Sequence, residues 1–303
     1  MAMSYKQNTT RKARSISFPP PLHPTTYRME KELNDIKTCL LSSLSTSCKP
    51  NTEAVCEGLL KLSPLYEGIM ELIKSLSFVQ NEKWVEELMD GLVGFLDVCG
   101  IMRNMVSELK AHVVGLQCAL RSRKGASIVE KSIAQFNGVR KRIRKDVKRL
   151  IASVKIPMAA TLEDHDHHHH HHELLIKRVK EVRELTVIIF ESLLNLLVLD
   201  SRTPLANKWP IVVSKLIKKT RVTCEEQHHQ QQQKHCGTIF DLEVLGVMSP
   251  IRYIKDGLSS WSYNKYQLET VEAQLERIED NLESIYMTLI RTRASLLNIV
   301  SHY

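Results

Sequence analysis

The densest positive charge in the chain lies between residues 139 and 150, around apolar side chains that recur at helical spacing. A basic amphipathic helix of this kind can bind an anionic membrane surface or the phosphates of a nucleic acid. The segment is therefore the candidate contact surface for an anionic partner. Its basic residues are Arg140, Lys141, Arg142, Arg144, Lys145, Lys148 and Arg149.

The same pattern has a purely structural interpretation. The apolar stripe can face the interior of a helical bundle, which leaves the charges solvated or paired within the chain. Acidic residues near the end of the chain could supply that pairing: Glu269, Glu272, Glu276, Glu279, Asp280 and Glu283. Binding to nucleic acid has the weaker support, because there is no zinc motif, aromatic platform or recognition motif.

A run of histidines from His167 to His172 follows Asp164-His165-Asp166. Neutral imidazoles bind Zn²⁺, Ni²⁺ and Cu²⁺. A low-complexity loop, however, lacks the fixed geometry of a metal site on rigid elements. We therefore predict no physiological metal site and no cofactor.

No catalytic arrangement is visible. Cys118 and Cys224 have no histidine or base motif beside them, so neither is a credible nucleophile. The glycines at 91, 94 and 100 form no phosphate-binding loop, and the lysine of such a loop is missing. The sequence predicts that the protein is not an enzyme and has no catalytic residues.

The residues between 81 and 123 predict one long helix. Two apolar series repeat every seven residues there, three positions apart, which is the pattern of a helix that needs a partner to cover its seam. The first series is Val85, Leu92, Cys99, Val106, Val113 and Leu120, and the second is Leu88, Phe95, Met102, Leu109 and Leu116.

A second heptad helix is predicted over residues 260–303. Its leucines are Leu268, Leu275, Leu282, Leu289 and Leu296, offset from Val271, Ile278, Ile285 and Ile299. No basic region precedes it, so a transcription-factor zipper is the weaker interpretation. We expect the two long helices to pack against each other, antiparallel, within an all-α, elongated helical bundle.

The remaining pattern predicts helices over residues 25–44, 127–155, 173–200 and 209–220, and two short helices divided at Ser63-Pro64. Pro157 is expected to end the helix that starts at residue 127. Residues 25–303 form one bundle domain, with low-complexity loops at about 157–172 and 222–238. Residues 1–24 are predicted to be a disordered basic tail, and an organelle transit peptide is the alternative.

The net charge of +8 favours acidic partners, whether lipid, nucleic acid or protein. Seven cysteines without a C-x-x-C pair indicate a reducing compartment. The most apolar window, residues 185–199, is shorter than the roughly 20 residues that span a bilayer. We expect an intracellular, cytoplasmic protein, with peripheral membrane or plastid association as alternatives.

Several motifs carry a family resemblance. They are Arg14-Ser15-Ile16-Ser17-Phe18-Pro19 with His23-Pro24, Lys83 to Gly91, Leu96-Asp97-Val98-Cys99-Gly100, Leu116 to Gly125, and Arg291 to Ile299. Together they resemble the plant-specific BYPASS-like family, also called domain of unknown function 241. The resemblance implies a link to root and shoot development, with no enzymatic activity and no catalytic residues to transfer.

The sequence thus predicts a non-enzymatic plant protein that acts as a protein-interaction or membrane-surface adaptor. A nucleic-acid-binding protein that uses residues 139–150 is the alternative. The sequence identifies neither the protein partner nor the oligomeric state.

Overall fold

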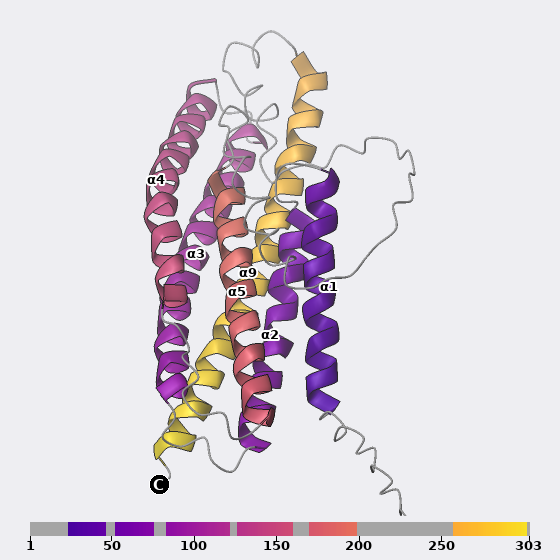
Figure 1. The fold of residues 1–303 in the computed structure, drawn as a ribbon. Helices are drawn as coiled ribbons and strands as arrows, with labels where there is room; N and C mark the ends of the chain where they lie inside the picture. The colour runs from indigo at the N-terminus through magenta and orange to yellow at the C-terminus, as the bar shows by residue number, and fades with distance from the viewer. Residues whose placement is uncertain are drawn as a thin grey trace, which may run out of the picture.

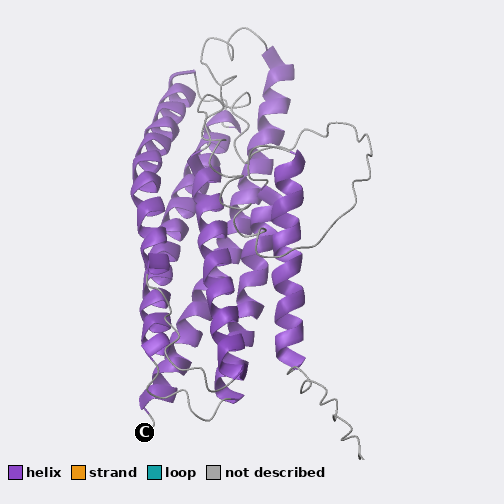
Figure 2. Ribbon diagram, viewed as in Figure 1, coloured by secondary structure: helices purple, strands orange, loops and turns teal. Residues whose placement is uncertain are grey.

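The structure is a computed structural model that describes residues 24–46, 52–75, 83–121, 126–159, 170–198 and 257–301. All of these residues are helical (Figure 2), which confirms the predicted all-α fold. The helices are α1 (Pro24–Thr46), α2 (Thr52–Ser75), α3 (Lys83–Arg121), α4 (Ala126–Ala159), α5 (His170–Val198) and α9 (Gly257–Ser301).

Five of these helices form a closed ring around the hydrophobic core. Around the ring, α3 packs against α4, α4 against α5, α5 against α2, α2 against α9, and α9 against α3. The sixth, α1, packs on α2 at the edge of the bundle (Figure 1). Each ring helix therefore packs against two ring neighbours, and α2 also packs against α1.

The two heptad helices pack against each other as predicted. Every residue of both heptad series in α3 is buried, and so are the five heptad leucines of α9. The helices are antiparallel, because the Cys99 thiol donates to the Leu282 carbonyl while Gln117, further along α3, donates to the earlier Glu272. The seam of α3 is thus closed by the C-terminal helix of the same chain.

Polar pairs border part of this seam. The Lys110 ammonium pairs with Glu279, and the Arg121 guanidinium is 2.9 Å from the Glu269 carboxylate. Arg103 pairs with Glu283 and also lies over the Tyr286 ring, 4.9 Å from its centroid. These contacts fix the register of the C-terminal half of α3 against residues 269–286 of α9.

The predicted division of the second helical region at Ser63-Pro64 is wrong. Residues 52–75 form one helix with Pro64 inside it. A proline in a helix interior costs about 3 kcal/mol, because it removes one hydrogen bond and crowds the preceding turn. Apolar side chains on both sides of Pro64 are fully buried in the core, including Leu59, Leu62, Leu65 and Ile69. Their continuous burial outweighs the local cost.

Several predicted boundaries shift. The helix predicted to stop at Pro157 continues to Ala159, and α5 begins at His170, so both helices extend into the stretch predicted as a loop at 157–172. The predicted helix at 209–220, the loop at 222–238 and the tail before Pro24 lie outside the described residues.

Candidate functional site

The basic segment lies on α4 and turns its apolar stripe inward. Val139, Ile143, Val147 and Leu150 are buried in the core, because α4 packs on one side against α3 and on the other against α5. The stripe follows the i, i+4, i+8 spacing that places side chains on one helix face. The structure therefore uses this stripe for packing, and the basic side chains lie around the remaining circumference.

The seven candidate cations are not equivalent. Arg142 forms an ion pair with Glu108 of α3, and Arg149 is 3.6 Å from Asp146 on its own helix. The Arg140 guanidinium lies 6.0 Å from the centroid of the Phe136 ring, and both Arg140 and Arg144 are half-buried.

The lysines among the seven lie on the outer side of α4. Lys141, Lys145 and Lys148 are all exposed and, at spacings of four and three residues, they share one helix face. We call these three lysines the basic face of α4. Together with the exposed, ion-paired Arg142 and Arg149, it can meet a partner from solvent.

Four of the six acidic residues predicted to pair with the basic segment contact α3 instead. The Glu269, Glu272 and Glu279 side chains contact α3. The two helices occupy different places in the ring, since α4 packs against α3 and α5 whereas α9 packs against α3 and α2. Glu269, Glu272 and Glu279, which could have paired with the basic segment, therefore pair with residues of α3.

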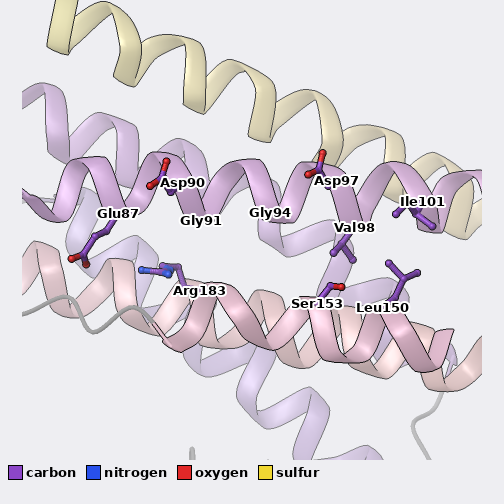
Figure 3. Close-up of a pocket in the computed structure, with 10 residues that line it drawn as sticks. All are labelled: Glu87, Asp90, Gly91, Gly94, Asp97, Val98, Ile101, Leu150, Ser153 and Arg183. Carbon is purple, nitrogen blue, oxygen red and sulfur yellow. The ribbon is translucent and has the colours of Figure 1, made fainter. Parts of the chain in front are cut away.

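A second candidate site is a pocket of about 460 Å³ where α3, α4 and α5 meet. Its polar lining includes Glu87, Asp90 and Asp97 of α3, Ser153 of α4 and Arg183 of α5. In Figure 3, Glu87 and Arg183 point toward each other, while Asp90 and Asp97 point away from Arg183. Val98, Ile101 and Leu150 supply an apolar wall.

Arg183 is the buried charge of this pocket. Its guanidinium lies against Gly91, where a Cβ would be only 3.3 Å from Nη2, so the glycine makes room for it. Burial lowers the pKa of Arg183 from its ordinary value, and the nearby Tyr66 and Glu87 act in the opposite direction. One carboxylate and one guanidinium at the base of a pocket are suited to structural charge balance.

The pocket offers little for covalent chemistry. The Ser153 hydroxyl donates to the Arg149 carbonyl at 3.4 Å, so its proton is directed to the main chain and not to a base. Among the residues that the structure describes, no group of three or more His, Cys, Asp or Glu side chains could hold a metal ion.

Residues 58–299 match the protein family described as Protein BPS1. The match extends over most of the chain and includes all of α3 and α9 up to residue 299. The chain belongs to the BPS1 family. This membership confirms the BYPASS-like resemblance seen in the sequence motifs. Searches of curated proteins and of solved structures found no match.

Both candidate sites fall inside the part of the chain that matches the BPS1 family, whereas α1 lies before it. Within the described residues, no helix is long and apolar enough to cross a membrane. The basic segment is recognisable in the amino-acid sequence, whereas the pocket is not. The available signal was the presence of two arginines, Arg178 and Arg183, in the apolar sequence of α5, because a buried arginine needs a carboxylate or other acceptor nearby.

Proposed function

We propose that this BPS1-family protein is a non-enzymatic adaptor that binds an anionic partner, a membrane surface or another protein, through the basic face of α4. One observation carries the proposal: Lys141, Lys145 and Lys148 are exposed while the apolar stripe of the same helix is buried. The positive charge is thereby presented on a rigid element. An intracellular, peripheral location is part of this proposal.

The burial of the stripe determines how such a contact would work. An amphipathic helix that inserts into a bilayer buries its apolar face among the lipids, but in α4 that face is already inside the bundle. Binding would therefore depend on charge alone, at about 1 kcal/mol for each lysine near an anionic surface. A contact of this kind is reversible and weakens as salt increases.

Sedimentation with phosphatidylserine vesicles tests the membrane form of the proposal. The triple variant K141E/K145E/K148E should lose binding to these vesicles. The matched control, K31E/K74E/K177E, reverses three exposed lysines on α1, α2 and α5 and should retain most of it. Binding that both variants retain, or that does not respond to salt, would contradict the proposal.

The nucleic-acid alternative uses the same lysines, so it needs a separate measurement. If phosphates are contacted, binding to duplex DNA or RNA should fall steeply on a log–log plot against salt, with a slope that reports the number of contacts. A steep slope for the wild type that K141E/K145E/K148E abolishes would favour nucleic acid over an adaptor at a membrane or protein surface.

The developmental role implied by the BYPASS-like resemblance is also part of the proposal. In a plant that lacks this protein, the wild-type chain should restore root and shoot growth. K141E/K145E/K148E, expressed to the same level, should fail to do so. Full rescue by this variant would separate the developmental role from the basic face.

A further inference from the structure

The C-terminal half of α9 carries exposed aliphatic side chains beside its seam with α3. Ile290, Leu297 and Val300 are each 38% exposed, although they lie among the buried heptad residues of the same helix. They recur at spacings of seven and three residues, which places them along one edge. Ile290, Leu297 and Val300 therefore lie along the same side of α9.

The edge faces the N-terminal half of α3. Gly100 lies opposite Tyr286, where a Cβ would be 3.9 Å from the Tyr286 ring. Because the helices are antiparallel, a residue seven places before Gly100 lies beside one seven places after Tyr286. Val93, which is 37% exposed, is therefore placed opposite Arg293, and Ile290 lies one turn before Arg293 on α9. The C-terminal end of α9 and the start of α3 lie together in Figure 1.

The composition of the flanking positions changes along this seam. In one half they form the polar contacts of Arg103, Lys110, Gln117 and Arg121 with the glutamates of α9. In the other half they include four aliphatic residues, Val93, Ile290, Leu297 and Val300, with Arg293 among them. Positions beside a two-helix seam are usually charged, and a contiguous exposed apolar strip is typical of a binding surface. We call these four aliphatic residues the apolar valley.

The charges around the apolar valley restrict what can occupy it. Glu86, Asp90 and Asp97 are exposed on the outward side of α3. On the α9 side lies Arg293, whose Nε is buried without a hydrogen-bond partner in the structure. A helix in the valley would therefore fit best with a basic flank toward α3 and an acidic or amide flank toward α9.

We propose that the apolar valley between α3 and α9 is the docking site for an amphipathic helix of a partner protein, with its basic flank over Glu86, Asp90 and Asp97. The site is distinct from the basic face of α4 and does not depend on the proposed membrane contact. It gives the protein a second binding surface of opposite charge.

A labelled synthetic peptide tests the assignment. The peptide has about 18 residues, with leucine at helical spacing, lysine on one flank and glutamate on the other. Fluorescence anisotropy should show that it binds the full-length chain. I290Q/L297Q should weaken binding roughly tenfold. D90N/D97N should also weaken it and reduce its salt dependence.

The control variant L60Q/I128Q removes two aliphatic side chains that are 52% and 45% exposed on α2 and α4, and should bind the peptide like the wild type. Circular dichroism must show the same helicity and melting temperature for I290Q/L297Q as for this control. Because K141E/K145E/K148E should also bind the peptide normally, a failed vesicle experiment leaves this test unaffected.

Three outcomes would overturn the proposal. The first is the absence of peptide binding to the wild-type chain. The second is an equal loss of binding in I290Q/L297Q and in the control. The third is a wild-type dimer in sedimentation velocity that I290Q/L297Q converts to a monomer, because the occupant would then be a second copy of this chain.

Discussion

The hydroxyl oxygens of Tyr66 and Thr186 lie 3.0 Å apart in the core, between α2 and α5. Thr186 also donates to the Val182 carbonyl at 2.8 Å, which occupies its single hydroxyl proton. Tyr66 must therefore be the donor and Thr186 the acceptor. Burial raises the pKa of the Tyr66 phenol above its ordinary value, so the group remains a neutral donor.

This direction of donation predicts an asymmetry between two substitutions. Tyr66→Phe removes the donor and leaves the Thr186 proton bonded, so it should lower the free energy of unfolding by about 1 kcal/mol. Thr186→Val leaves a buried Tyr66 hydroxyl without an acceptor and should cost more, about 1–3 kcal/mol. Urea denaturation of both variants measures the difference. A larger loss for Tyr66→Phe would reverse the assigned donor.

Gly68 sets the distance between α1 and α2. A Cβ at this position would be 2.7 Å from Met29 Cγ and 2.8 Å from its Sδ, closer than side chains pack. Gly68→Ala should therefore destabilise the protein by about 1–3 kcal/mol through overpacking. Amide hydrogen exchange should accelerate in α1 first, because this helix packs on α2 outside the ring.

Two further variants make the Gly68 prediction specific. In the double variant Met29→Ala/Gly68→Ala, the Met29 side chain that would clash with the new Cβ is absent. The double variant should therefore lose less stability than the sum of the losses in the two single variants. Gly115→Ala places its Cβ in open space on an exposed part of α3 and should stabilise by up to about 1 kcal/mol. If the losses in the free energy of unfolding of Met29→Ala and Gly68→Ala simply added in the double variant, the clash between the two residues would be contradicted.

The ion pair between Arg277 and Glu53 predicts a dependence of stability on pH. Two guanidinium nitrogens of Arg277 donate to the Glu53 carboxylate at 2.6 and 2.8 Å. This hydrogen bonding lowers the pKa of Glu53 from its ordinary value of 4.5 and outweighs the opposite effect of burial. The stabilisation is therefore present above the ordinary pKa and is lost as the pH falls through the lowered value.

Glu53→Gln should lower the melting temperature slightly near pH 7, because the pair is exposed and contributes less than about 1 kcal/mol. The gap between variant and wild type should narrow as the pH falls below 4.5 and close once Glu53 is protonated in the folded state. A gap that is unchanged at low pH would show that the carboxylate charge is not the cause.

The described cysteines should differ in reactivity. Burial raises the pKa of the Cys99 thiol to about 12 and that of Cys56 to about 11, whereas Cys118 is exposed on α3. Iodoacetamide should therefore label Cys118 in the native chain, and Cys56 and Cys99 only after unfolding. Peptide mapping by mass spectrometry measures this order. Rapid native labelling of Cys99 would mean that the α3–α9 seam opens.

The long helices could be predicted from sequence because their pattern is periodic and repeated. In α3 the residues at both heptad positions are buried without exception, and the register needs no knowledge of the partner. At Pro64, by contrast, the prediction from sequence was wrong. A local rule predicts a break there, but the leucines on either side are held in one continuous core, and tertiary packing outweighs the propensity.

The candidate sites also differ in how far the sequence alone could predict them. The basic segment of α4 is visible in the sequence, because clustered charge and helical spacing are local properties. The ion pair of Arg142 is not visible, because its partner is Glu108 of another helix, α3. The pocket at Arg183 and the apolar valley are formed by residues from separate helices, which no local pattern connects.

The sequence by itself determined an all-α chain with two heptad helices, a basic helical segment and membership of a BYPASS-like family. Helical periodicity and short motifs are encoded by neighbouring residues. Only the tertiary structure decided that the acidic residues of α9 meet α3, that the apolar stripe of α4 is buried, and that Ile290 and Leu297 remain exposed. Those outcomes depend on which helices become neighbours in the ring, and contacts between distant segments are set by packing of the whole chain.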